Sequence, residues 1–163
     1  IGYAIPGLIL AVGITRFLVF ADRNIFSDLD FVITGSLVGL VLAYIIKSYA
    51  LANSSIESGY ERISNSIDNS ARLLGARGSI LLGKVHFPLM KTSFLTAILL
   101  VTSEVVKELP ATLILRPFNF DTLAVVTYTY AAEERMYQAA MPSLAIVLIG
   151  ICLLYTSDAA DDA

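Results

Sequence analysis

The residues best suited to do chemistry form a small polar cluster inside an apolar stretch of the chain. The cluster contains one serine, two glutamates and one lysine: Ser103, Glu104, Lys107 and Glu108. On a helix, residues three or four positions apart share a face, so the charged members can lie together. Within a membrane such charges normally face a bundle interior or an aqueous cavity. The sequence predicts either a translocation pathway or an internal set of ion pairs. We favour the pathway because Pro110 must break the helix just beyond these side chains.

Other reactive side chains do not assemble a catalytic or metal site. His86 is the single histidine, and we expect it at the membrane interface without a ligand partner. Cys152 is the single cysteine and lies in an apolar run, where a packing role is expected. An intramembrane enzyme would need a nucleophile–base pair or a metal cluster. We therefore predict no catalytic residue and no metal ligand in this chain.

A glycine pattern in the central part of the chain resembles a phosphate-binding loop only superficially. Residues 78–85 read GxxxxGKV. A working loop needs Ser or Thr after the lysine to hold magnesium, and a preceding strand to aim the backbone. Val85 follows the lysine here, and the flanking patterns are helical. We therefore expect this chain to bind no nucleotide and to need no cofactor, so that any ATP is bound by a partner subunit.

Composition places the cluster in a membrane protein. Of 163 residues, 56% are hydrophobic and 15% are charged, and the mean hydropathy is +0.75. Charges are sparse in four apolar stretches that indicate membrane spans, at about 2–20, 32–52, 92–107 and from 142 to 152 or beyond. These patterns predict an all-α fold, a polytopic transmembrane helical bundle, over residues 1–152. The acidic stretch 153–163 is expected to be a non-native tail, and the net charge of −3 offers no basic stripe for nucleic acid.

Basic residues between the apolar stretches predict the orientation in the membrane. The segment 54–91 holds the densest group of lysines and arginines: Arg62, Arg72, Arg77, Lys84 and Lys91. The connections 21–30 and 108–138 are net acidic. Cytoplasmic loops carry the excess of Lys and Arg, so 54–91 is predicted to be cytoplasmic and the other two external. Arg16 and Lys47 fall near span ends, where snorkelling to the interface is expected.

The central loop is predicted to be helical rather than flexible. Its apolar residues recur at helical spacing: Ile56, Tyr60, Ile63, Ile67, Ala71 and Leu74. Ser54 and Glu57 fit a capping box, and Ser66 fits the cap of a second helix. Gly75 is expected to end that helix in a left-handed conformation, and Pro88 to begin the third span. Such an apolar stripe on a cytoplasmic helix predicts a docking partner or a packed loop.

The same loop carries a spaced motif. It reads Asn69-Ser70-Ala71, three residues, Gly75, nine residues, then Val85-His86-Phe87-Pro88. This pattern resembles the cytoplasmic signature of permeases of binding-protein-dependent ABC importers, which reads EAA, three residues, Gly, nine residues, I-x-L-P. The alanine, the glycine and the proline match by identity, whereas the valine and the phenylalanine replace Ile and Leu. The departure lies at the front, where Asn69 and Ser70 replace Glu and Ala.

Two further segments, 2–7 and 107–124, are similar to the ferric-iron type of these permeases, whose close relatives serve thiamine uptake. The resemblance implies a multi-pass subunit of the bacterial cytoplasmic membrane. It also implies two copies of a cytoplasmic ABC ATPase, a periplasmic or surface-tethered solute-binding protein and a second permease half. The chain would then be the C-terminal portion of a longer protein. An ion-coupled secondary transporter is the alternative that could use Glu104 and Glu108, but it would not explain the loop.

Overall fold

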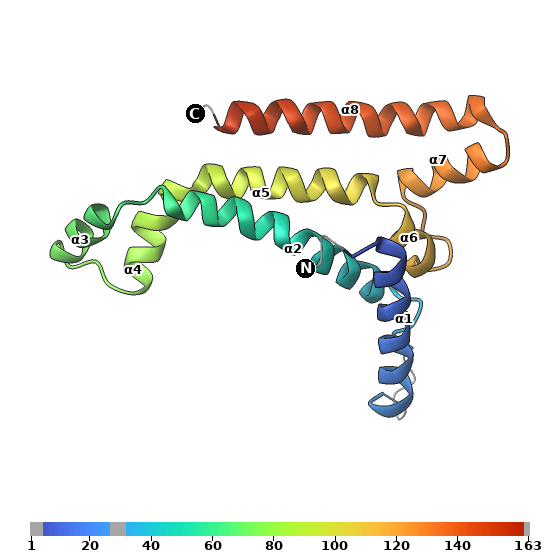
Figure 1. The fold of residues 1–163 in the computed structure, drawn as a ribbon, viewed down its shortest axis with the longest axis horizontal. Coiled ribbons are helices and arrows are strands. Elements are labelled where there is room, and N and C mark those ends of the chain that lie inside the picture. The colour runs from blue at the N-terminus through green and yellow to red at the C-terminus, as the bar shows by residue number, and fades with distance from the viewer. Residues whose placement is uncertain (1–4, 27–31, 162–163) are drawn as a thin grey trace. The chain divides into compact units, whose positions relative to one another are not determined.

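The computed structural model describes residues 5–26 and 32–161, with side chains up to residue 157, and all regular structure among them is helical. Figure 1 follows the helices in chain order: α1 (Gly7–Asn24), α2 (Leu37–Glu61), α3 (Asn65–Leu73), α4 (Ser79–Leu81), the π-helical segment η2 (Leu82–His86), α5 (Phe87–Lys107), α6 (Pro110–Leu115), α7 (Leu123–Ala132) and α8 (Met136–Asp161). The predicted all-α polytopic fold is confirmed.

Three helical segments of the described chain are long and apolar enough to cross a membrane: Leu37–Glu61, Ser79–Lys107 and Met136–Ser157. Helix α1 is not among them, because its 18 residues include the charges of Arg16, Asp22 and Arg23. The predicted span at 2–20 begins outside the described residues and stays a prediction.

Pro88 lies in the first turn of α5, as predicted, but the helical segment of membrane length starts before it. It is the second residue of α5, inside a helical segment that already starts at Ser79. A proline inside an α-helix removes one backbone hydrogen bond and clashes with the preceding turn. The π-helical turn η2 comes directly before it, and such a turn shifts the hydrogen bonding from four to five residues. The wider turn lets the helix continue through the proline.

The last span also starts earlier than predicted. Pro142 lies inside α8, which begins at Met136 and continues through the acidic stretch to Asp161. The span therefore has 22 residues up to Ser157 instead of ending after a short run from the proline. Helices outlast an apolar segment readily because Ser, Ala and Asp carry only small propensity penalties. Whether 153–163 belongs to the natural protein stays a prediction.

The first helix predicted in the central loop is the end of α2 rather than a separate helix. Ser54 and Glu57 lie inside α2, which continues to Glu61, so the predicted capping box is wrong. The Glu57 carboxylate instead accepts a 3.5 Å bond from the Asn53 amide, four residues earlier on the same helix. The second predicted helix is α3, and its N-cap is Ser64 rather than Ser66. Local pattern located this helix to within two residues.

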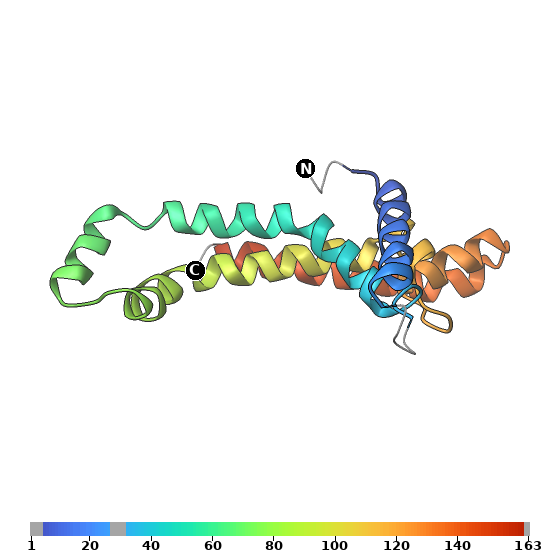
Figure 2. The same ribbon diagram turned by 90° about the horizontal axis from the view of Figure 1, so that it is seen from below.

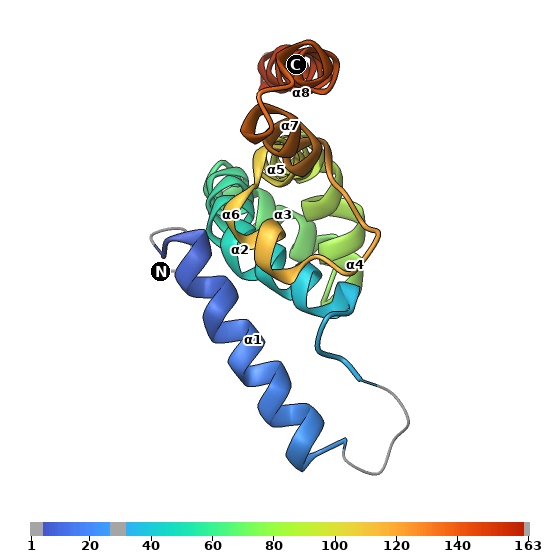
Figure 3. The same ribbon diagram turned by 90° about the vertical axis from the view of Figure 1, so that its right-hand side faces the viewer.

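The described chain divides into two compact units, each treated by itself below. One unit contains the residues up to Ala50 together with Thr102–Ile151, and the other contains Leu51–Val101 and the residues from Cys152. In the first unit α1 packs against α6, as Figures 2 and 3 show near the N-terminal end of α1. Its buried core joins α1, α2 and α6: Ala11, Ile14, Leu18, Leu40, Ala43, Ala111 and Leu115.

Small residues allow close helix contacts in both units. A Cβ at Gly39 would lie 2.8 Å from Leu18 Cδ1, so α1 and α2 approach closely there. In the second unit, a Cβ at Gly59 would lie 2.5 Å from Ser93 Cβ, and the Ser55 hydroxyl donates a 3.2 Å bond to the Ser93 carbonyl. These contacts hold the end of α2 against the start of α5.

Candidate functional site

The signature residues of the central loop occupy a helix, a turn and a second helical segment. Asn69, Ser70 and Ala71 lie on α3, Val85 lies in η2, and Phe87 and Pro88 open α5. No residue of the fully described α3 is buried. Leu73 and Leu74 follow the triplet and are each 89% exposed, which gives this end of the loop an apolar surface. The docking role of that surface stays a prediction.

Gly75 makes the turn that the sequence predicted. Its φ is +87°, in the left-handed region, directly after the Leu74 C-cap. The Gly75 amide donates to the Arg72 carbonyl at 3.0 Å, and the Ala76 amide donates to the Ala71 carbonyl at 3.0 Å. This pair of bonds is the Schellman motif, in which the left-handed residue is itself the first of the two donors. Ala71 and Gly75, two of the residues that match the signature by identity, both take part in these bonds.

The glycine pattern that resembles a phosphate-binding loop forms helix instead. Residues 79–86 are α4 and η2, and α3 rather than a strand precedes them. Gly78 turns the chain into this segment with φ of +52°. An exposed loop cradling a phosphate is therefore not formed by these described residues.

His86 is not the unpartnered interfacial residue that we expected. It is buried, at 5% exposure, and its Nε2 lies 2.6 Å from Asp68 Oδ1 on α3. The sequence spacing of 18 residues gave no signal for this pair, because it depends on how α3 folds back onto η2.

The polar cluster at the end of α5 is divided between two ion pairs. Glu104 Oε1 and Lys107 Nζ lie 2.7 Å apart, as the spacing of three predicted. Glu108 lies beyond the end of α5 and pairs with Lys47 of α2 instead. The predicted common face of all the charged members is therefore wrong, because the helix ends at Lys107 and turns Glu108 away. Ser103 lies nearby and is half-buried.

Glu108 is the most enclosed charge among the described residues of the first unit. Its side chain is 6% exposed, and its Oε1 accepts a 3.3 Å bond from the Ala111 amide at the start of α6. A Cβ at Gly7 would lie 2.7 Å from the same oxygen, so α1 also passes close to it. One carboxylate thus contacts α2 and α6 and packs against α1. Lys47 was predicted to snorkel, and the ion pair corrects that interpretation.

A hydroxyl pair extends the contact between α2 and α6. The hydroxyls of Tyr44 and Thr112 lie 2.7 Å apart, and Thr112 donates a 2.8 Å bond to the Glu108 carbonyl. Sequence reasoning missed both residues. The available signal was the spacing of three between Tyr44 and Lys47, which places both on one face of α2.

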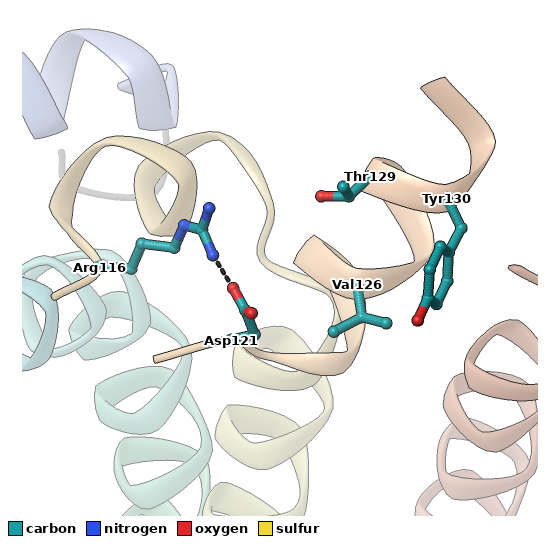
Figure 4. A pocket seen from close by; sticks show the side chains of 5 residues that line it. All are labelled: Arg116, Asp121, Val126, Thr129 and Tyr130. Carbon is teal, nitrogen blue, oxygen red and sulfur yellow. Dashed lines mark ion pairs between the residues drawn. The ribbon is translucent and has the colours of Figure 1, made fainter. Parts of the chain in front are cut away.

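A second polar feature lies in the connection from α6 to α7. Arg116 and Asp121 form an ion pair beside a cavity of about 180 Å³, which Val126, Thr129 and Tyr130 also line (Figure 4). The two charged side chains point at each other, so they neutralise one another. The pair therefore closes the connecting loop, and the cavity keeps no net charge.

Comparison with known proteins connects this arrangement to transport. The chain is 25% identical over 147 residues to the Fe(3+)-transport system permease protein FbpB 2 of Haemophilus influenzae, covering 90% of this chain. It is 31% identical over 129 residues to PhnV of Salmonella typhimurium, a permease protein whose name assigns it to a 2-aminoethylphosphonate transport system, covering 79% of this chain. The chain is homologous to the permeases of binding-protein-dependent ABC importers.

This permease chain spans 27% of the length of FbpB 2 and 48% of the length of PhnV. No family model matches it. The three span-length helices of its described part and its permease homologues place it in the bacterial inner membrane as a multi-pass protein. The predicted superfamily is thereby confirmed, although the two substrates named among its relatives differ.

Proposed function

We propose that this chain is part of the permease subunit of an ATP-driven importer that moves a small substrate across the cytoplasmic membrane. The observation that carries the proposal is the homology to two permeases over most of the chain. The signature loop supports it, because the Gly75 turn joins an exposed helix to a membrane-length segment.

In the proposed mechanism the central loop transmits movement from the ATPase, and the substrate passes between the membrane helices. Two copies of a cytoplasmic ATPase would bind and hydrolyse ATP, and their closure would move α3 through its exposed leucines. Helix α5 follows α4 and η2 without a break, so a displacement at the loop would be carried into a span. Rocking of helices between inward-open and outward-open states would then expose the substrate to each side in turn. A solute-binding protein and a second permease half complete the proposed complex.

For the substrate we propose ferric iron first. The segments 2–7 and 107–124 resemble the ferric type, and one relative carries Fe(3+) transport in its name. A thiamine-type or other small solute is the alternative, and the name of PhnV makes 2-aminoethylphosphonate the one to compare.

The polar cluster itself favours no permanent cation site. Glu104 and Glu108 are each paired with a lysine, so the two carboxylates carry no surplus negative charge. We propose that Ser103, Glu104 and Lys107 border the pathway at its more exposed side. Lys47 and Glu108 would hold the helix break beside it. Passage of a weakly held substrate suits such a neutral cluster better than tight binding does.

The test is uptake by the complete importer in proteoliposomes, with the full-length permease, its ATPase and its binding protein. We expect radiolabelled ferric iron to enter only with ATP and the binding protein present. Uptake driven by an ion gradient alone would contradict the proposal and favour a secondary transporter. Accumulation of 2-aminoethylphosphonate in place of iron would retain the importer and replace its substrate. Co-purification measures the partners, with two ATPase copies expected per complex.

A further inference from the structure

His86 joins three segments of the central loop at one buried imidazole. The residue ends η2, its Nε2 lies 2.6 Å from Asp68 Oδ1 on α3, and its ring packs edge-on against Tyr60 near the end of α2. The ring centroids of the aromatic pair are 5.6 Å apart with an interplanar angle of 69°. Edge-to-face packing at this separation is a favourable arrangement of aromatic rings. The imidazole of η2 therefore contacts both α3 and the end of α2.

Helix α3 has little else to hold it in place. It is nine residues long and buries none of them. The connection from α3 to α4 contains Gly75 and Gly78, both at positive φ and with nothing within 4 Å of an added Cβ. Beyond the two bonds that close the helix at Gly75, such a connection gives little resistance to bending, since glycine adopts many backbone conformations. A force applied to α3 would thus be absorbed by this connection unless a side chain ties α3 to η2.

The hydrogen bond between Asp68 and His86 supplies that tie. The His86 side chain is 7% exposed and the Asp68 side chain 21%, so water competes weakly for the bond. The charged and titratable neighbours in this contact are Asp68, Tyr60 and Arg72, whose guanidinium lies 4.0 Å from Asp68 Oδ2. The other ring nitrogen, Nδ1, is buried and has no hydrogen-bond partner among the described residues. The ring is therefore held through Nε2 and by packing.

The position of His86 in the helix suits transmission. It is the last residue of the π-helical turn, and α5 begins at the next residue. A π-helical turn is a local irregularity that often marks a functional site. When α3 moves, Asp68 moves with it and displaces the imidazole through their hydrogen bond. The displacement therefore acts at the junction between η2 and α5.

We propose that His86 is a positioning residue that couples movement of α3 to movement of α5. The inference rests on the proposed importer function and deepens it. His86 contacts no substrate and no nucleotide. It connects α3, with its exposed leucines, to the span. Movement that the ATPase imposes on α3 then displaces α5 instead of only bending the connection at Gly75 and Gly78.

The test uses the complete importer in liposomes and compares two side chains that differ by one methylene. In His86→Gln, the amide nitrogen reaches as far as Nε2 and can donate to Asp68. In His86→Asn, the amide is too short to reach. We expect His86→Gln to keep ATP-dependent uptake within about twofold of the native protein. His86→Asn should lower uptake about tenfold, as loss of a hydrogen bond to a charged group predicts, while basal ATP hydrolysis continues.

Lys84→Gln is the matched control, because Lys84 lies in the same π-helical turn and is exposed. It should leave uptake and the number of ATP molecules hydrolysed per substrate unchanged. A second measurement does not depend on transport. Spin labels at Ser70 on α3 and Lys91 on α5 should give a broader distance distribution in His86→Asn than in His86→Gln.

Several results would overturn the inference. Equal uptake by both His86 variants would show that the bond transmits nothing. Equal loss of membrane insertion or of ATPase co-purification in both variants would reduce His86 to a folding role. An unchanged distance distribution would show that α3 is held by other contacts. Failure of the proposed function is distinguishable, since the native importer would then show no ATP-dependent uptake at all.

Discussion

Removal of one partner from the Lys47–Glu108 ion pair should destabilise the permease strongly. The Glu108 carboxylate is 6% exposed and the Lys47 side chain is 21% exposed. Lys47→Met leaves Glu108 buried with only the Ala111 amide as a donor. Glu108→Gln leaves the lysine unpaired but keeps an oxygen for that amide. Each single change creates an uncompensated charge where water has little access.

The magnitude follows from the burial of the two groups. Breaking a buried ion pair by removing one partner costs about 3–5 kcal/mol. Because Lys47 is partly exposed and can retain some water, we expect about 3 kcal/mol for Glu108→Gln. Lys47→Met should cost more, since the charge that it leaves behind is the better buried one.

The double variant Lys47→Met with Glu108→Gln removes both charges and keeps the acceptor for Ala111. We expect its free energy of unfolding to be within about 1 kcal/mol of that of the native protein, because replacing a whole buried ion pair is often neutral. The pair Glu104 and Lys107 is the control, since Lys107 is 58% exposed. Its disruption should cost less than about 1 kcal/mol, as for an ordinary surface ion pair.

The assay is reversible unfolding in mixed detergent micelles, followed by circular dichroism, together with uptake by the same preparations. Recovery of stability and uptake in the double variant would establish a structural pair. The reasoning would be refuted if both single variants were as stable as the native protein while both of them and the double variant showed reduced uptake. That outcome would return Glu108 to the substrate pathway.

Three further predictions concern the turn, the topology and the helix contacts. Gly75→Val should abolish stimulation of ATP hydrolysis by the binding protein while membrane insertion persists, because a left-handed β-branched residue costs more than about 1–2 kcal/mol; unchanged stimulation would remove this turn from the mechanism. In a cysteine-free background, Ser64→Cys should react with impermeant maleimide only from the cytoplasm and Phe118→Cys only from outside; labelling of both from one side would overturn the orientation. Gly7→Ala should lower the unfolding free energy by about 1–3 kcal/mol through overpacking against the buried carboxylate, whereas Gly13→Ala, with nothing within 4 Å, should be neutral or stabilising.

Much of this permease could be predicted because the relevant information is local. The apolar stretches predicted helices of membrane length, since burial in lipid demands an unbroken apolar segment. Gly75 was predicted to be left-handed because a helix of this pattern must end there, and its φ of +87° confirms it. The pair Glu104 and Lys107 followed from helical spacing alone. Span ends were less well predicted at Pro88 and Pro142, because a proline reads as a boundary unless the preceding turn can accommodate it.

The long-range partners were decided only by the tertiary structure. Lys47 and Glu108 are 61 residues apart, and Asp68 and His86 are 18 apart. Each of these residues has several plausible partners in the sequence, and helical spacing favours the nearest one. The break after Lys107 rotates Glu108 towards α2, and the fold of α3 onto η2 brings Asp68 to the imidazole. The sequence by itself indicated the long apolar helices and the helix that ends at Gly75, because backbone hydrogen bonding and apolar burial are satisfied within each of these segments. The pairing of buried charges was left to packing, because a charge selects the partner that the assembled helices bring within reach.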